Sequence, residues 1–585
     1  MSDPKTPESK PSGASSAKRP AKRELTMEHR LMLAFALMGI VLIGSTYLMP
    51  KPPEEAPKSA SKAPATAASE IKPAPAPPVE RKAGVEKTAP PKTASIAGAT
   101  EETAVIETDL YRIEFTNRGA VARSWILKAF KDSNGKPLDL VNPKLQGKTV
   151  YPMAVRFHSG QSAEPLNTPL YAMRLIEGGI GIEFEYSVAP WYARKRLLFK
   201  KGSYLTTLES EVRNSGTPKP HLIYWRGGFG DASVIGAAAA TSTVRFDLAA
   251  NEVKLLTAAD AGGAPGGYQA HRGRFSFAGI QDAYFAAVAL PDTNRDFEIH
   301  SLSDSIENSI DGKYDPHPGV ALGGDAVNRF EIFVGPKDTD LLKSISPRLE
   351  QLVDFGWFAF LAKPLFLALH WLNAGYIHNY GWTIVIITVI INFLLLPLKI
   401  SSLKSMKKMS ELQPQIAAIN EKYRGMKMTD PRKQNQQAEV MELYKKHNVN
   451  PVGGCVPMAL QIPFFIAFYK VLSAAIELRG ASWLWVEDLS RPETIPIRIL
   501  PVAMVVTQFI MQKMTPATSA DPAQQRVMLM MPAFLGFMFY GVSSGLVLYW
   551  LTGNLVGILQ QWFFNKTFHA PAAAPPAAAP KKKAK

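Results

Sequence analysis

Residues 389–398 read VIINFLLLPL, a run of hydrocarbon side chains that contains a single amide, Asn392. The apolar sequence GWTIVIIT precedes the run, and the basic sequence KISSLKSMKK follows it. Residues 376–398 are long enough to cross a bilayer as a helix, since about 20 apolar residues span the hydrocarbon core. A polar side chain in such a span is costly unless another polar group or water satisfies it. Asn392 therefore indicates either a hydrogen bond between helices or a hydrated cavity.

Other apolar segments predict a membrane protein with six spans. Residues 31–49 carry no charge and, at about 1.5 Å per residue, reach one hydrocarbon thickness, so we expect an uncleaved signal anchor. The sequence GVSSG at 541–545 divides the last apolar segment into a hairpin of two short spans, which predicts local thinning of the bilayer. The predicted spans are residues 31–49, 376–398, 453–476, 497–513, 527–541 and 545–564.

The charge of the loops predicts the orientation of these spans. The chain has a net charge of +16, and residues 399–452 hold eleven basic residues against five acidic ones. Residues 477–496 are nearly balanced. Because cytoplasmic loops carry an excess of Lys and Arg, we expect residues 399–452 and both termini to lie inside the cell and residues 50–375 outside it. This orientation explains the basic composition without a sequence-specific nucleic-acid partner.

The segments outside the spans differ in composition. Residues 50–100 are rich in Pro, Ala and Lys, which predicts a disordered linker. The single cysteine, Cys455, excludes an internal disulfide. The other predicted segments are a basic N-terminus (1–30), an external domain (101–345), an external interfacial helix (346–375), a cytoplasmic helical hairpin (399–452), an external loop (477–496), a cytoplasmic loop (514–526) and a basic cytoplasmic tail (565–585).

Short segments of alternating apolar and polar residues recur in the external domain. Gly, Asn, Asp and Pro separate them, a pattern typical of a large antiparallel β-sandwich. The Gly-rich stretches 227–240 and 261–267 predict long loops. The clearest predicted strands are residues 111–115 (YRIEF), 181–186 (GIEFEY), 205–210 (LTTLES) and 329–334 (RFEIFV).

No pattern in this domain indicates catalysis. Its sequence contains no metal-ligand spacing, no nucleophile elbow and no phosphate-binding loop. His271 and His300 are isolated, and we interpret each as an ordinary surface or loop histidine. We therefore predict no catalytic residue, no metal site and no cofactor.

Residues 346–375 mix many aromatic side chains with Lys363 and His370. Aromatic rings suit the headgroup region, so we expect a helix that lies on the outer membrane surface. A further span is the alternative, but Lys363-Pro364 interrupts the apolar run.

Amides recur in the cytoplasmic half of the predicted spans. Asn392 is joined at a similar depth by Gln461, Gln508 and the hydroxyl of Thr507, and Asn554 lies somewhat higher. Thr388 lies one turn from Asn392 on the same helix face. Each group alone would be a hydrogen bond between helices, whereas together they favour a hydrated cavity open to the cytoplasm. The absence of Asp and Glu among them argues against a proton- or sodium-coupled transporter.

Methionines and aliphatic residues follow a helical period in the predicted hairpin 399–452. Met406, Met409 and Leu412 lie in one predicted helix, and Tyr444 lies in a second. Their shared face is either an adaptable docking surface for apolar partners or the inner face of a hairpin that packs on itself.

Four stretches carry a resemblance to a known family. They are LQPQIAAINEKY (412–423), MELYKKHNVNPVGGCVPMALQIPFF (441–465), DPAQQRVMLMMP (521–532) and SSGLVLYWLTGNLVGILQQ (543–561). These sequences resemble the YidC/Oxa/Alb family of membrane protein insertases, in particular its Gram-negative members with a large periplasmic domain. The resemblance implies an α-helical polytopic inner-membrane protein with a five-helix insertase core, plus a periplasmic all-β supersandwich domain without catalysis.

The resemblance implies an insertase and chaperone that acts alone or with the Sec translocon. A hydrophilic groove open to the cytoplasm would receive the polar parts of nascent membrane proteins while their apolar parts enter lipid. Thr388, Phe465, Tyr549 and Trp550 resemble groove residues that contact the substrate. The hairpin and the basic tail resemble contacts for the ribosome and the targeting machinery, and membrane lipids are further partners. The alternatives are a polytopic solute transporter with a periplasmic binding domain and a membrane-tethered enzyme that acts on carbohydrate.

One position departs from the family's pattern. The family usually has Arg or Lys five residues before the Pro-Leu that ends this span, whereas this chain has Asn392. An amide keeps hydrogen bonding and hydration but lacks the long-range attraction of a cation for acidic substrate segments. We therefore expect weaker insertion of strongly acidic segments, unless another cation compensates. Lys399 is the nearest candidate.

Overall fold

A computed structural model of the chain describes residues 95–142, 150–157, 163–176, 178, 180–233, 241–262, 267–307, 314–423, 432–449, 456–515 and 522–567. The predicted N-terminus (1–30), the signal anchor (31–49), almost all of the linker (50–100) and most of the tail (565–585) lie outside these residues.

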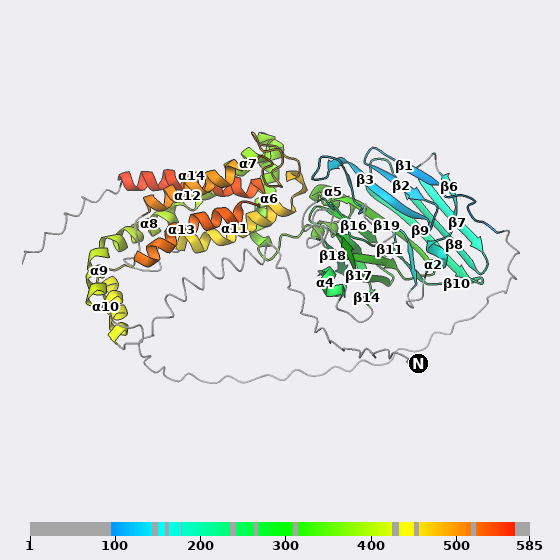
Figure 1. Cartoon of the computed structure of the whole chain (residues 1–585), viewed down its shortest axis with the longest axis horizontal. Helices are drawn as coiled ribbons and strands as arrows, with labels where there is room; N and C mark the ends of the chain where they lie inside the picture. The colour runs from blue at the N-terminus through cyan, green and yellow to red at the C-terminus, as the bar shows by residue number, and fades with distance from the viewer. Residues whose placement is uncertain are drawn as a thin grey trace, which may run out of the picture. The chain divides into compact units, whose positions relative to one another are not determined.

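The N-terminal half of the described chain is a domain of antiparallel β-sheets (Figure 1). One sheet has the order β1 (Thr103–Glu107), β2 (Tyr111–Thr116), β3 (Val121–Lys131), β4 (Pro137–Asp139). A ten-stranded sheet has the order β13 (Glu252–Leu256), β12 (Ser242–Asp247), β15 (Phe275–Gln281), β16 (Phe285–Leu290), β19 (Val327–Pro336), β9 (Leu205–Asn214), β8 (Trp191–Phe199), β7 (Gly181–Val188), β6 (Ala172–Ile176), with β10 (Thr217–Pro218) paired to β9. A five-stranded sheet has the order β14 (Tyr268–Gly273), β17 (Phe297–Glu307), β18 (Tyr314–Gly323), β11 (His221–Trp225), β5 (Val155–Phe157).

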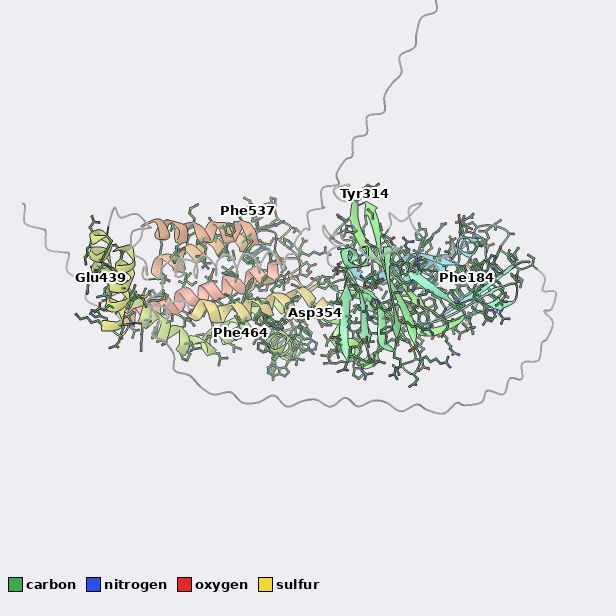
Figure 2. The ribbon with its side chains drawn as sticks, turned by 90° about the horizontal axis from the view of Figure 1, so that it is seen from below. Phe184, Tyr314, Asp354, Glu439, Phe464 and Phe537 are labelled. Atoms are coloured by element: carbon green, nitrogen blue, oxygen red, sulfur yellow. The ribbon has the colours of Figure 1, made fainter. Side chains whose placement is uncertain are left out.

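The predicted antiparallel β-sandwich is confirmed, and the four clearest predicted strands fall within β2, β7, β9 and β19. Burial alternates along β9, as expected for a strand with one face on the core. By contrast β15 is buried along its whole length, since both of its faces are covered. Aromatic rings fill the space between the sheets, and Phe184 lies among them, 6.0 Å from Phe115 by ring centroids (Figure 2).

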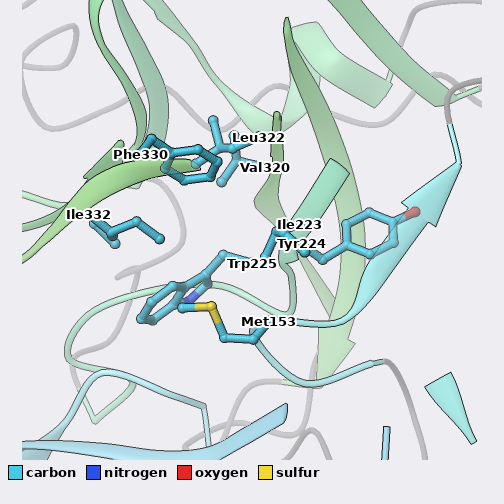
Figure 3. Close-up of a pocket in the computed structure, with 9 residues that line it drawn as sticks. Met153, Ile223, Tyr224, Trp225, Val320, Leu322, Phe330 and Ile332 are labelled. Carbon is cyan, nitrogen blue, oxygen red and sulfur yellow. The ribbon is translucent and has the colours of Figure 1, made fainter. Parts of the chain in front are cut away.

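A small cavity of about 20 Å³ lies in this core (Figure 3). Ile223 and Trp225 of β11 line one side, and Phe330 and Ile332 of β19 line another. Its lining is apolar, and its volume is close to that needed by a single water molecule. It is therefore a packing void, too small for a sugar or a peptide.

In the expected loop 261–267, residues 261–262 end a short helix, α4 (Ala258–Gly262), and residues 263–266 lie outside the described residues. One expectation for this domain is wrong. His300 is buried on β17 and is not a surface histidine, because its ring is paired on both sides. Its Nδ1 accepts from Arg156 Nε at 3.1 Å, and its Nε2 lies 2.5 Å from a carboxylate oxygen of Glu298. His271 is half-buried on β14.

The C-terminal half is helical. Its elements are α5 (Thr339–Ile345), η4 (Leu349–Leu352), α6 (Ala359–Leu372), η5 (Asn373–Ile377), α7 (Tyr380–Leu394), α8 (Leu396–Glu411), α9 (Gln413–Lys422), α10 (Arg432–Lys446), α11 (Val456–Ala474), η7 (Ile476–Leu478), α12 (Ile499–Met514), α13 (Pro522–Phe539) and α14 (Ser544–Thr567). A short helix, α2 (Glu164–Asn167), belongs to the β domain.

Pro397 separates α8 from α7. It stands in the first turn of α8, where a residue without an N–H group loses no helical hydrogen bond.

The chain turns sharply before α7. The segments Ala359–Ile377 and Tyr380–Leu394 are bent by 119°, and His378 between them has a left-handed backbone with φ 55°. Asn379 caps α7 by accepting a hydrogen bond from Trp382 N at 3.2 Å. Within the described residues, this bent pair passes a length and hydropathy test for a membrane span, and no helix passes it alone.

Lys195 of β8 is a fully buried lysine in the β domain, and burial lowers the pKa of its amine to about 7. Its Nζ donates to the carbonyl oxygens of Gly119, Ala120 and Met153 at 2.9, 3.0 and 2.7 Å. Ala120 and Met153 both have left-handed φ angles, 53° and 77°, which cost energy in a residue with a side chain. Lys195 thus holds two strained turns against the ten-stranded sheet.

Replacing Lys195 by Met would leave three buried carbonyl groups without their donor. Each such loss costs about 1–3 kcal/mol, so we expect Lys195→Met to lower the free energy of unfolding by about 3 kcal/mol or more. Urea denaturation followed by tryptophan fluorescence measures the change. Lys200→Met is the control, because the Lys200 side chain is 63% exposed. Equal stability of the two variants would show that the turns do not depend on Lys195.

Candidate functional site

The predicted polar residues of α7 are hydrogen bonded within their own helix. Thr388 is fully buried, and its Oγ1 donates to Ile384 O at 2.6 Å. Asn392 Nδ2 donates in turn to Thr388 O at 2.9 Å. Each side chain thus has one partner in its own helix, and the amide of Asn392 keeps a second N–H and its oxygen for other groups. These two residues lie one turn apart on one face of α7, as predicted.

That face of α7 contacts α14. Gln560 Nε2 donates to the backbone oxygen of Asn392 at 3.2 Å. A Cβ at Gly553 would lie 4.0 Å from Asn392 Nδ2, an ordinary contact distance, so this position of α14 faces Asn392. Gln560 is 8% exposed, and its Oε1 has no hydrogen-bond partner although it is buried. An orphaned buried acceptor of this kind is a natural site for an ordered water.

Asn554 joins α14 to α12. Its Nδ2 donates to Met504 O at 3.3 Å and to Thr507 Oγ1 at 3.2 Å, and both Asn554 and Thr507 are buried. Thr507 Oγ1 itself donates to Ala503 O at 2.8 Å within α12, so it can accept from Asn554 at the same time. In an apolar surrounding such a bond favours one register of the two helices, because displacement would leave the amide donor unpaired. We call Asn392, Thr507, Asn554 and Gln560 the amide layer.

An aromatic cluster lies beside the amide layer. Trp550 of α14 packs at 5.0 Å from Phe465 of α11 and at 4.9 Å from Phe539 of α13, by ring centroids. Trp550 Nε1 donates to Gln508 Oε1 of α12 at 3.4 Å. Four helices therefore meet around one half-buried indole.

Two family models match the chain: "60Kd inner membrane protein" over residues 371–571 and "YidC periplasmic domain" over residues 103–368. A membrane protein insertase YidC of Geotalea daltonii is 33% identical over 93% of this chain and 100% of its own length. The chain belongs to the YidC family of membrane protein insertases. A YidC of Cupriavidus necator is 32% identical over 83% of this chain and 86% of that protein.

Two solved structures of YidC proteins are also similar. One, an active YidC insertase with its first transmembrane domain resolved, is 19% identical with a TM-score of 0.35 and covers 82% of this chain and 95% of that one. The other, YidC from Thermotoga maritima, is 14% identical with a TM-score of 0.28 and covers 80% of this chain and 99% of that one. These scores are too low to add to the family assignment.

The structure brings together some of the residues predicted for the insertase groove. Phe465, Gln508 and Trp550 are in contact, and Thr388 and Asn392 are bonded to each other. Tyr549 instead stacks on Phe468 at 4.2 Å, and Gln461 is exposed on α11.

Two residues of the site were missed by the sequence analysis: Phe539 and Gln560. Gln560 follows the same rule that singled out Asn392, an amide within an apolar segment, and could have been found by it. The contact of Phe539 with α11 and α14 depends on how the helices pack, which the sequence does not show.

The predicted docking residues of the insertase hairpin face inward to a large extent. Met409 and Leu412 are buried with Ile416 and Val449, and Tyr444 packs against them. Met406 is half-buried. The contacts match the alternative of a hairpin that packs on itself, so apolar docking there would require the hairpin to open.

The insertase helices also carry exposed apolar stripes. Ile386, Ile390 and Phe393 of α7 are 38%, 56% and 54% exposed. Val502, Val506 and Ile510, spaced by four residues, form a second stripe on α12. Contiguous exposed apolar surface of this kind marks a face that meets lipid or an apolar partner. Phe537 on α13 also projects from the helices (Figure 2).

Asn554 provides a test of the amide layer. Asn554→Leu keeps the volume but removes the hydrogen bond from α14 to α12, and we expect a loss of about 1 kcal/mol in stability. Thermal unfolding of the full chain in detergent measures it. Gln461→Leu changes an exposed amide and should have a smaller effect. If both variants melt at the same temperature, the interhelical bond contributes nothing.

Proposed function

We propose that this insertase receives the hydrophilic segment of a nascent membrane protein in a hydrated groove lined by the amide layer and the aromatic cluster. The observation that carries the proposal is the concentration of uncharged polar side chains on α7, α12 and α14, helices whose other faces are exposed and apolar. The orphaned Gln560 Oε1 supports hydration at this position. Polar groups lower the cost of bringing a polar client segment into the bilayer.

We further propose six spans and a five-helix core made of α7, α11, α12, α13 and α14, with both termini in the cytoplasm. The predicted anchor at 31–49 would be the sixth span. Trp357 and Phe360 are 90% and 74% exposed near the start of α6, which supports a helix that lies on the outer surface. The 119° bend before α7 supports the change from a surface helix to a crossing one.

The driving force in this proposal is the burial of the client's own apolar surface. Transfer of apolar surface out of water contributes about 25 cal/mol per Å². The apolar stripes on α7 and α12 give the client's apolar segment a path into lipid while its polar segment follows the amide layer. The route needs no cofactor and no covalent step, so we propose that the chain is not an enzyme.

Nascent membrane proteins are the substrates of this family. The Sec translocon, the ribosome and the targeting machinery are proposed partners, reached through the basic hairpin and tail.

A solute transporter is the alternative function. The amide layer holds no carboxylate that could couple transport to an ion, which favours the insertase groove.

Photocrosslinking tests the groove. A photoreactive side chain at Trp550, which is half-buried, or at Gln461, which is exposed, should crosslink to a short nascent membrane protein during insertion. At Thr388 and Phe465, which are buried, we expect crosslinks only if the helices separate as the client enters. Leu175 on β6 is 53% exposed and serves as the control. Insertion without any crosslink from α11 or α14 would exclude a groove at this place.

Deletion of residues 105–340 tests whether the β domain takes part. We expect the shortened chain to insert a short client, because the amide layer and the aromatic cluster lie wholly in the helical half. Insertion into vesicles, scored by protease protection, measures the activity. Loss of activity in a variant whose helices remain folded would assign the β domain an essential role.

A further inference from the structure

The external loop, residues 477–496, joins the N-terminal ends of three helices. Asn379 Nδ2 at the start of α7 and Ser544 N at the start of α14 donate to backbone oxygens of this loop, at 3.1 and 2.7 Å. Leu500 N, in the first turn of α12, donates to Glu493 Oε2 at 3.0 Å. These three helices carry the amide layer, so the external loop holds them together at the ends where they begin.

Burial also holds the external loop in place. Leu478, Val486 and Leu489 are 2%, 2% and 1% exposed, and Trp483 is 8% exposed. A Cβ at Gly381 of α7 would lie 2.2 Å from the Trp483 ring, so the indole can rest on this helix only because the residue is glycine. The external loop is therefore a packed element that belongs to the helical core.

Two arginines of the external loop bind one carboxylate of the β domain. Arg479 Nη2 and Arg491 Nη2 both donate to Asp231 Oδ2, at 2.5 and 3.3 Å. The side chains of Asp231 and Arg479 are 5% and 6% exposed, and that of Arg491 is 25% exposed. The rings of Tyr284 and Phe285 lie 5.5 and 5.3 Å from the Arg479 guanidinium, which adds cation–π contacts from the β domain. Asp231 thus fixes the external loop at two points.

Bonds within the β domain orient this carboxylate and its main partner. Asp231 Oδ1 accepts from Ser233 N at 3.0 Å, and Arg479 Nη2 also donates to Lys131 O at 2.8 Å. A buried ion pair adds little net stability compared with apolar packing, but loss of one partner leaves a costly uncompensated charge. Such a pair therefore selects one arrangement of the groups that it joins.

We propose that Asp231 is a positioning residue that clamps the external loop, and through it keeps α7, α12 and α14 together at this end. This inference rests on the proposed function. In the proposed orientation this end faces outward, so the helices separate for a client only at the opposite end. The membrane then stays closed to ions during insertion. The β domain thus controls closure of the groove without lining it.

The test uses the full chain reconstituted in vesicles that contain a pH-sensitive dye. A pH step outside the vesicles reports ion leak during insertion of a short client, and protease protection scores the insertion separately. We expect Asp231→Ala to raise the leak rate about tenfold, because the external loop loses its anchor and Arg479 its counter-ion. The amount of inserted client should stay the same, since the clamp does not contact the client.

Asp304 provides a matched control. It accepts from Arg226 Nε at 3.1 Å, the side chains are 6% and 30% exposed, and this ion pair lies wholly within the β domain. We expect Asp304→Ala to lower the thermal stability of the β domain without changing the leak rate. The comparison separates loss of the clamp from general weakening of the β domain.

Two further variants distinguish a positioning role from a merely structural one. Asp231→Ala combined with Arg479→Met removes both buried charges and should regain thermal stability relative to Asp231→Ala alone. The leak should nevertheless stay raised, because the external loop still lacks its anchor. Arg491→Gln removes only the more exposed arginine and should raise the leak to a smaller extent.

Three results would overturn the inference. They are an unchanged leak rate in both Asp231→Ala and Arg491→Gln, an equal rise in Asp304→Ala, and a normal leak rate in the double variant. All three leave the proposed groove intact, because insertion is scored separately. Failure of the unmodified chain to insert the client would instead count against the proposed function.

Discussion

The hydrogen bond from Asn554 to Thr507 and to the Met504 carbonyl is the contact on which the helical half depends. It lies between α14 and α12, whose outer surfaces are apolar and give no directional preference for one register over another. A buried amide does give such a preference, because displacement by one residue would leave its donor unpaired. Once α14 is fixed in this register, Gly553 and Gly557 face Asn392 and Lys399, and Trp550 enters the aromatic cluster.

The strands were more predictable than the contacts between them. Period-2 alternation identified β2, β7, β9 and β19. Burial alternates along β9 and the first half of β19, whereas the first four residues of β7 are all buried. His300 was misjudged because its partner Arg156 is 144 residues away and reaches it across the sheet from β5. The local sequence around His300 gives no sign of a partner so far away in the chain. The short helix α4 was missed for a related reason, since Gly and Ala next to one another predict a turn unless neighbouring strands hold them.

The same difference applies to the site: its polar residues could be predicted from the sequence, and the contacts between them could not. Asn392, Asn554 and Gln508 were recognisable as polar groups in apolar segments, which is a local property of the sequence. Their pairing was not: Gln508 bonds to Trp550 and Asn554 bonds to Thr507, so they do not form one continuous cluster. The hairpin was ambiguous because a face that docks a partner and a face that packs on itself have the same helical period. Burial of Met409 and Leu412 favours packing, which periodicity could not decide.

The two faces of α7 suit the two parts of a client in the proposed mechanism. Ile386, Ile390 and Phe393 form the exposed apolar stripe, and Thr388 and Asn392 form the polar face. Thr388 and Asn392 each follow a stripe residue by two positions, which is about 200° around a helix of 3.6 residues per turn. The apolar and polar faces of α7 are therefore nearly opposite. In the proposed mechanism, a client that straddles this helix can keep its hydrocarbon in lipid and its polar segment on the side of Asn392.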